Sequence, residues 1–334
     1  MDNSVAIPDN IILTDAYQRQ FSYLRLSITD LCNFKCNYCL PNGFQGKASQ
    51  NELSLKEIKT LVASFAELGF KKIRLTGGEP SLRSDVLDII DICASQPGIE
   101  KVCITTNGYK LNQFLPEWIK AGIDQVNISI DSLSAQQFEL ITSSSDLPMM
   151  LGAIQDAIEN GFTAIKINTV LLREHFDSQV KPMIDWVKNK PITLRFIELM
   201  QTGENMEYFE RQHVSAEQIN MWLERQGWVI KDRLIHSGPA IEYKHSKYKG
   251  SIGIIAPYSK DFCDSCNRLR ITAQGQLHLC LFSDDGKDLR PFLKAGNAVQ
   301  LTQFIRASIY HKLPKHDLQQ RRTGATRNFA MLGG

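Results

Sequence analysis

The feature that most constrains the fold of this chain is a regular alternation of strand-like and helix-like segments between residues 21 and 227. Each strand-like run is followed within a few residues by an amphipathic run. Residues 54–69, for example, open with a capping box of Ser54 and Glu57 and stop at Gly69. Short connections of this kind predict parallel strands with right-handed crossovers. The strand-like runs are 23–29, 71–76, 101–105, 125–130, 164–172 and 192–199.

Six such units predict an α/β fold, an incomplete (βα)6 TIM-like barrel rather than a closed eight-stranded one. A doubly wound sheet is the alternative. After about residue 228 the strand-like runs become hairpin-spaced and two helical runs follow, so we expect a C-terminal β-rich and helical extension that closes the barrel. The expected division is a polar lead-in at 1–20, the barrel at 21–227, the extension at 228–320 and a tail without helix or strand pattern at 321–334.

Composition excludes several classes of protein. Hydrophobic residues make up 43% of the 334 residues, which is typical of a folded domain, and the formal net charge of +2 argues against a broad nucleic-acid surface. The N-terminal residues do not resemble a signal peptide, and no apolar run approaches membrane-spanning length. We therefore expect a cytoplasmic protein that binds neither nucleic acid nor membrane, in which cysteines serve as metal ligands or buried thiols.

Three cysteines lie together directly after the first predicted strand. Cys32, Cys36 and Cys39 have the spacing C-x3-C-x2-C. Thiolates are soft ligands that suit zinc or iron–sulfur clusters, and structural zinc normally takes four ligands. Three thiolates can instead hold three corners of a four-iron cube and leave one iron open, so the spacing favours a cluster. A zinc site completed by a distant Cys or His is the alternative.

A second group of three cysteines lies in the predicted extension. Cys263, Cys266 and Cys280 have the spacing C-x2-C-x13-C. A zinc ribbon with a His as its fourth ligand, such as His278, is the alternative to a second open cluster. The remaining cysteines fall in apolar helix and strand patterns and are expected to be buried thiols; they are Cys93 and Cys103.

The first cysteine loop, with Tyr38 before its last cysteine, resembles the signature of the radical S-adenosylmethionine (SAM) superfamily. The resemblance implies a radical SAM type of barrel in which SAM binds the open iron of a [4Fe–4S] cluster. One electron from the cluster then yields a 5′-deoxyadenosyl radical that abstracts hydrogen. The "GGE" at 77–79 resembles the motif that meets the methionine part of SAM. The residues expected at SAM are Tyr38, Gly78, Ser129 and Met200, although a packed hydrophobe is nearly as good an explanation for Met200.

The second cysteine group, the "NRLR" at 267–270 and the final Gly333–Gly334 resemble the GTP 3′,8-cyclases of molybdenum cofactor biosynthesis, from about Leu13 to Gly334. The resemblance implies two [4Fe–4S] clusters, with guanine at the open iron of the second. Hydrogen would leave C3′ of GTP and C3′ would bond to C8, giving (8S)-3′,8-cyclo-7,8-dihydroguanosine 5′-triphosphate. A cyclic pyranopterin monophosphate synthase would use this product. In that family the double glycine reaches the active site.

A triphosphate needs cations, and this chain has no Walker A loop. Arg and Lys residues recur on separate predicted strands, which indicates a polar lumen suited to bidentate phosphate pairing. Carried over by motif, the expected GTP-binding residues are Arg25, Arg74, Thr105, Lys166, Arg268, Leu269 and Arg270, with Lys72 and Arg195 as second choices and Arg327 as a weaker candidate in the tail.

Two other functions remain open at this point. One is a radical SAM enzyme that modifies a peptide or protein and carries an auxiliary cluster. The other is a zinc-stabilised module that binds RNA. The leading hypothesis also requires a reductant and allows a homodimer, while the sequence assigns no residue as the catalytic acid or base.

Overall fold

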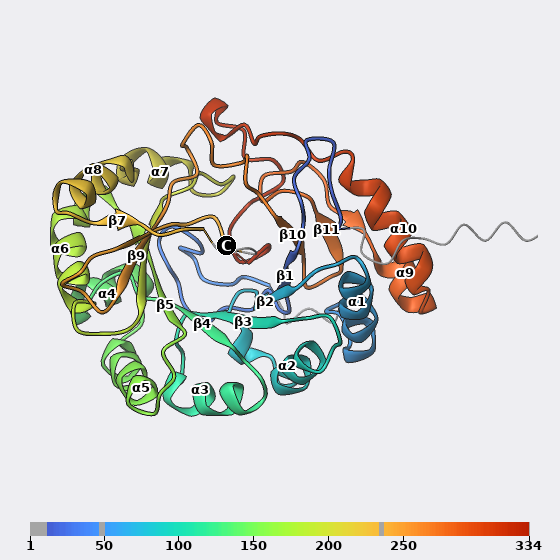
Figure 1. Cartoon of the computed structure of the whole chain (residues 1–334), viewed down its shortest axis with the longest axis horizontal. Helices are drawn as coiled ribbons and strands as arrows, with labels where there is room; N and C mark the ends of the chain where they lie inside the picture. Colours follow the sequence, from blue (N-terminus) through green and yellow to red (C-terminus); the bar gives the residue numbers. More distant parts are fainter. Residues whose placement is uncertain (1–11, 47–50, 234–236, 334) are drawn as a thin grey trace, which may run out of the picture.

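The computed structural model describes residues 12–46, 51–233 and 237–333, and its centre is a ring of parallel strands (Figure 1). Residues 1–11 of the expected lead-in and Gly334 of the tail lie outside the described residues. The six predicted strands are present and pair in parallel in chain order. They are β1 (Tyr23–Ser27), β2 (Lys72–Thr76), β3 (Lys101–Thr106), β4 (Gln125–Ser129), β5 (Ile165–Leu171) and β6 (Thr193–Glu198).

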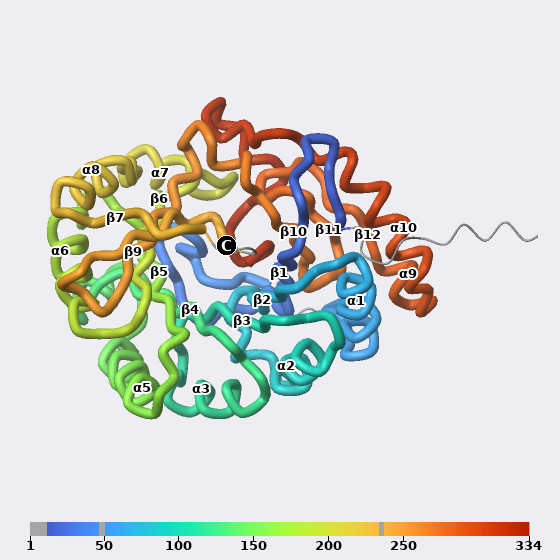
Figure 2. The backbone as a smooth tube through the Cα atoms, in the orientation of Figure 1, coloured from blue at the N-terminus to red at the C-terminus, as the bar shows by residue number. Residues whose placement is uncertain are grey.

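The helices of these units lie outside the ring, where they cover the outer face of the sheet (Figures 1 and 2). The first helix, α1, begins with the predicted capping box, in which Ser54 and Glu57 satisfy each other's backbone donors. The other helices of this part are α2 (Val86–Ala94), α3 (Leu111–Lys120), α4 (Ala135–Thr142), α5 (Leu147–Glu159), α6 (Phe176–Trp186), α7 (Met206–Gln212) and α8 (Glu217–Arg225), with α1 at Leu55–Glu67 and 3₁₀ turns at Pro80–Leu82 and Arg173–His175.

The C-terminal extension adds strands to both edges of the sheet. Strand β9 (Ser251–Ile255) pairs in parallel with β6, and β10 (Arg268–Ile271) pairs in parallel with β1. The hairpin spacing in the sequence predicted only antiparallel partners for β9 and β10. Those antiparallel pairings are also present. The remaining elements of the extension are β7 (Val229–Ile230), β8 (Ile241–Lys244), β11 (Gln276–His278), β12 (Lys287–Asp288), α9 (Arg290–Ala295), α10 (Ala298–Ile309) and a 3₁₀ turn at Leu318–Gln320.

The sheet order is β12-β11-β10-β1-β2-β3-β4-β5-β6-β9-β8-β7. Strands β1 to β6 follow chain order without a reversal, which excludes the doubly wound alternative. Within the described residues no strand pairing joins β9 to β10, so the incomplete TIM-like barrel is confirmed. The described end of the tail runs into the middle of the ring, where Gly333 lies against Thr76 of β2 (Figure 1).

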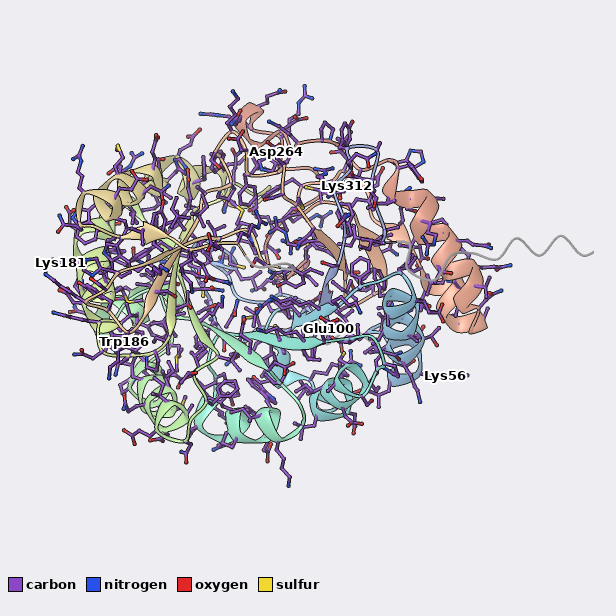
Figure 3. The ribbon with its side chains drawn as sticks, in the orientation of Figure 1. Lys56, Glu100, Lys181, Trp186, Asp264 and Lys312 are labelled. Atoms are coloured by element: carbon purple, nitrogen blue, oxygen red, sulfur yellow. The ribbon has the colours of Figure 1, made fainter. Side chains whose placement is uncertain are left out.

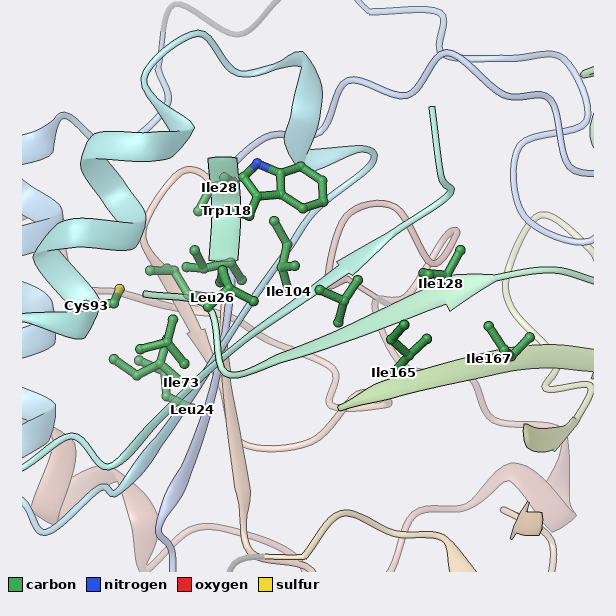
Figure 4. Close-up of a cluster of buried hydrophobic side chains, with 14 of the residues drawn as sticks. Leu24, Leu26, Ile28, Ile73, Cys93, Ile104, Trp118, Ile128, Ile165 and Ile167 are labelled. Atoms are coloured by element: carbon green, nitrogen blue, oxygen red, sulfur yellow. The ribbon is translucent and has the colours of Figure 1, made fainter. Parts of the chain in front are cut away.

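The hydrophobic core lies between the strands and the outer helices (Figure 4). Leu24 and Leu26 of β1 are fully buried there, together with Trp118 of α3. Because strand residues alternate between faces, Arg25 between the two leucines points to the inside of the ring. The apolar outer face thus fixes which polar side chains line the lumen.

The described part of the expected lead-in, residues 12–20, packs against the barrel. Leu13 is buried in the main core, and the carboxylate of Asp15 binds Arg19 at 2.6 Å in a buried ion pair. Arg19 also donates to the carbonyls of Leu313 and Pro314, at 2.7 Å each, and of Cys263, at 3.3 Å. One guanidinium therefore joins the start of the chain to the second cysteine loop and to the segment after α10.

No helix in the described part of the chain is both long enough and apolar enough to cross a membrane.

Replacing Arg19 with Met should lower the free energy of unfolding by about 3–5 kcal/mol, because Asp15 would remain buried without its counter-ion. Urea unfolding followed by circular dichroism measures the loss. The control is Arg321→Met: Arg321 makes an ion pair with Glu210 at 2.9 Å on the surface, and its loss should cost at most about 1 kcal/mol. Equal effects of the two substitutions would contradict the anchoring role of Arg19.

Candidate active site

The first cysteine loop follows β1 at the carboxyl end of the barrel, where barrel enzymes place their chemistry. Backbone hydrogen bonds from Lys35 and Asn37 to the last turn of α4 hold the loop, at 3.0 Å each. Cys32, Cys36 and Cys39 are free, partly exposed and line one cavity, which we call the upper cavity. Burial is the main cause that raises the pKa of Cys32 to about 11 and that of Cys39 to about 12.

The "GGE" loop after β2 packs directly on the cysteine loop. A Cβ on Gly78 would lie 2.0 Å from the carbonyl oxygen of Leu31, so only glycine fits there. Glu79 is fully buried and accepts hydrogen bonds from the Thr106 hydroxyl at 2.8 Å and from the Asn107 backbone at 2.6 Å. The carboxylate therefore ties this loop to the end of β3 instead of facing the cavity.

The residues expected at SAM come together. Tyr38, Gly78, Ser129 and Met200 all line the upper cavity with the three cysteines. Met200 also packs against an apolar cluster that includes Phe329 and Leu332, so it is a packed hydrophobe as well as a cavity residue, and its contact with SAM stays a prediction. Four separate segments of the chain thus contribute to one concave surface, as a small-molecule site requires.

Tyr38 is positioned by a carboxylate behind the cavity. Its hydroxyl donates to Asp131 at 2.8 Å, and the other oxygen of Asp131 accepts from the Val170 backbone at 2.8 Å. Burial raises the pKa of Asp131 to about 6, although both hydrogen bonds oppose the shift. Asp131 thereby fixes the ring of Tyr38 beside the cysteines.

The second cysteine group faces a cavity deeper in the ring, which we call the lower cavity. Cys263 and Cys266 precede β10 and Cys280 follows β11. His278, the example of a zinc-ligating His, is 3.2 Å from the Ser283 hydroxyl and does not line this cavity, whereas His316 does. Among the described residues no Asp or Glu lines it, whereas the basic side chains that do are Arg25, Lys72, Arg74, Arg195, Arg268 and Arg270.

The lower cavity has a strongly positive potential. Tyr23 is buried, which alone would raise its pKa, but Arg74, Arg25 and Lys72 lower that pKa to about 7. Burial likewise raises the pKa of Cys266, yet Arg268 and Lys312 outweigh it and lower the pKa to about 6. The cations thus favour the thiolate of Cys266, whereas burial raises the pKa of Cys263 in the same group, as it does those of Cys32 and Cys39.

The two cavities meet in the middle of the ring. Asn168, Ile197 and Met200 line both of them, and Oδ1 of Asn168 is a buried acceptor without a hydrogen bond in the structure. The tail lies beside this junction. Arg25 and Arg270 donate to the carbonyl of Gly333, in the latter case at 3.1 Å.

Some residues expected at GTP lie elsewhere than in the lower cavity. Thr105 lines the upper cavity and accepts from Arg74 at 3.2 Å. The Leu269 side chain is fully buried in the core, and the residue lines neither cavity. Lys166 lines a third, basic opening, where it pairs with Glu242 at 2.6 Å. Arg327 lines neither of the two cavities.

Sequence reasoning missed several polar residues of the site. Tyr23 and Asn127 line the lower cavity, and Asn107 reaches the sulfur of Cys32 at 3.8 Å. A strict two-residue alternation would have found the first two, since Tyr23 shares the face of Arg25 and Asn127 lies opposite Lys166 in register. Asn107 lies in a loop, where no such period applies.

The donor sets suit iron–sulfur clusters. Within the described ranges, no three Cys, His, Asp or Glu side chains surround a single ion position. The cysteines of a cube each bind a different iron, so this finding is compatible with clusters and does not favour a zinc site. Cys32, Cys36 and Cys39 would hold the cluster at the upper cavity, which Gly78 also lines.

Two family models match the chain. Residues 26–187 match the radical SAM superfamily, and residues 192–318 match the C-terminal domain of molybdenum cofactor synthesis. The first contains the upper cysteine group and the second contains the lower one.

Curated relatives match almost the full length. The chain is 48% identical to GTP 3′,8-cyclase of Psychromonas ingrahamii over 323 residues, 96% of this chain and 95% of the relative. It is 46% identical to GTP 3′,8-cyclase of Cronobacter sakazakii over 325 residues, 96% of this chain and 99% of the relative.

A solved structure shares the fold. The chain resembles Streptococcus suis SuiB bound to S-adenosylmethionine with a TM-score of 0.58 at 13% identity, covering 90% of this chain and 69% of that one. These comparisons favour the cyclase hypothesis over the peptide-modifying and RNA-binding alternatives. The chain belongs to the GTP 3′,8-cyclase family of the radical SAM superfamily.

Proposed function

We propose that this protein converts GTP to (8S)-3′,8-cyclo-7,8-dihydroguanosine 5′-triphosphate, using SAM and two [4Fe–4S] clusters, as the first step of molybdenum cofactor biosynthesis. The observation that carries the proposal is the pair of three-cysteine groups, one at each of two adjoining cavities. Of the residues that the structure describes, cations and no carboxylate line the lower cavity. Near full-length similarity to GTP 3′,8-cyclases supports it.

In this proposal the upper cavity holds SAM. Cys32, Cys36 and Cys39 would hold the cluster there, and the cluster with SAM would supply the radical chemistry that removes hydrogen from C3′ of GTP. The residues of the chain orient that cofactor: the backbone at Gly78 contacts its amino acid part, while Tyr38, Ser129 and Met200 contact the rest. A site closed to water protects the radical, and the tail residues Phe329 and Ala330 cover one side of the cavity.

The lower cavity holds GTP in this proposal. Guanine lies at the cluster of Cys263, Cys266 and Cys280, and C3′ faces the junction with the upper cavity. The phosphates bind Arg25, Arg74, Arg268 and Arg270, joined by Lys72, Arg195 and Lys166, while Thr105 supports Arg74. Fixing both reactants at adjoining cavities brings C3′ close to the radical and C8 close to C3′.

The reaction implies further partners. An external reductant supplies the electrons, and a cyclic pyranopterin monophosphate synthase uses the product. We also propose that the protein acts in the cytoplasm, where GTP is available. A homodimer stays an expectation that sizing chromatography tests.

Replacing Cys36 with Ala should abolish formation of 5′-deoxyadenosine and lower the iron content, because two thiolates would not hold the upper cluster. Anoxic assays with dithionite and SAM measure the nucleoside by chromatography. The control is Cys93→Ala, which changes a fully buried thiol of α2 outside both groups and should retain SAM cleavage. Undiminished cleavage in the Cys36 variant would contradict the assignment.

Replacing Cys266 with Ala should separate the two halves of the reaction. We expect 5′-deoxyadenosine to form, because the upper cavity is intact, while the cyclised nucleotide falls below detection. Both products are quantified from the same anoxic incubation with GTP. Wild-type amounts of cyclised product would rule out the lower cluster as the guanine site.

Replacing Gly333 with Ala should impair cyclisation more than folding. Gly333 has a φ of +61°, and an added Cβ would lie 2.0 Å from a Thr76 side-chain atom, so the tail must move and Arg25 and Arg270 lose a carbonyl partner. We expect turnover to fall about tenfold with little change in the melting temperature, since a misplacement of about 1 Å is costly to catalysis. The control is Gly152→Ala in α5, where nothing lies within 4 Å.

A further inference from the structure

Glu242 of β8 makes the main carboxylate contact with the cations below the lower cavity. Its Oε1 accepts from Lys166 at 2.6 Å and from Arg195 at 3.2 Å, and Oε2 lies 3.6 Å from Lys231. Burial would raise the pKa of Glu242, but Lys166 and Arg195 outweigh burial and lower that pKa to about 2. The residue is therefore an anion at every physiological pH.

Glu242 lies at a place that a bound polyanion would approach. It lines the third opening, the basic opening named above, which shares Lys72, Arg195 and Gly238 with the lower cavity. In the proposed binding mode, a nucleotide with its base at the second cysteine group would extend its phosphates toward these shared residues. The phosphate farthest from the base thus comes nearest to the cations that Glu242 holds.

The Glu242 carboxylate and a terminal phosphate would compete for the same cations. A terminal phosphate carries up to two negative charges and a carboxylate carries one, so the phosphate binds Lys166 and Arg195 more strongly once it arrives. Displaced Glu242 keeps Lys231 as a partner at the mouth of the opening. Conversely, a nearby carboxylate weakens the hold of the cations on any triphosphate.

This weakening matters because substrate and product carry the same triphosphate. A buried cavity with many cations and no counter-ion would retain the product as tightly as the substrate. We propose that Glu242 is an internal counter-ion that competes with the terminal phosphate for Lys166 and Arg195, and so sets the rate at which the triphosphate product leaves. The release part of this inference rests on the proposed function.

The test is Glu242→Gln, which removes the charge and keeps the shape. We expect the Kd for GTP to fall about tenfold, as for the loss of one competing charge at a partly buried site, and the Kd for GDP to change much less. Equilibrium dialysis measures both dissociation constants, at a pH well below the pKa of Lys166. Burial and then Arg195 lower that pKa to about 8, although Glu242 acts in the opposite direction.

Kinetics give a second readout. A single turnover of Glu242→Gln should form cyclised product at the wild-type rate, because the residue touches neither cysteine group. Multiple turnovers should slow about tenfold and the KM for GTP should fall, in line with slower release. A slower single turnover would show that Glu242 acts on the chemistry instead and would overturn the proposal.

Glu100→Gln is the matched control. Glu100 lines the same opening, immediately before β3 (Figure 3), but its partner is Lys71, at 3.1 Å. If both variants tighten GTP equally, or if GDP tightens as much as GTP, the effect is one of overall charge and the proposal is wrong. Should Glu242→Gln fail to fold, Glu242→Asp replaces it, with a smaller tightening in the same direction expected.

The measurements of GTP and GDP binding test the role of Glu242 separately from the proposed function on which it builds. If the wild-type protein binds GTP but does not cyclise it, the proposed function fails while the comparison of GTP with GDP still decides the role of Glu242. If wild-type protein cyclises GTP and the variants bind it alike, only the role of Glu242 fails.

Discussion

Positive charge buried inside the sheet is the constraint on which the rest of this structure depends. The parallel register places Arg25 beside Arg270 on one neighbouring strand and beside Arg74 on the other. Like charges at such positions repel each other, and buried guanidinium groups need partners. The partners come from the Tyr23 hydroxyl and from the carbonyls of Leu332 and Gly333. The tail and the lumen are thus parts of one electrostatic arrangement.

The sequence predicted the barrel well, because its six strand–helix units are local patterns. Each of the six strands begins and ends within two residues of its expected bounds. The parallel addition of β9 and β10 to the two edges was not visible, since hairpin spacing reports only the nearest neighbour along the chain. The entry of the tail into the ring was also invisible to residue patterns, because turns held by Arg25 and Arg270 have no periodicity.

The candidate site was predictable to the extent that it follows strand geometry or cysteine spacing. Both cysteine groups and Gly78 line the cavities as expected. The positions of the basic residues on the predicted strands indicated that they line the lumen. The sequence could not show that Lys166 has a carboxylate partner, because Glu242 is 76 residues away. The motif at residues 267–270 also could not show which side chains face the lumen, because it spans both faces of β10 and Leu269 lies on the core face.

The pairing of β1 with β10 has a consequence for how the chain folds. Strand β1 is made early, yet the strand that covers its outer edge is Arg268–Ile271. Arg19 likewise cannot make its hydrogen bonds to the carbonyls of Leu313 and Pro314 until those residues have been synthesised. Contacts of such long range form slowly, and an uncovered strand edge invites aggregation in the meantime. One edge of β1, the strand that leads into the first cysteine loop, therefore has no partner strand until Arg268–Ile271 have been synthesised.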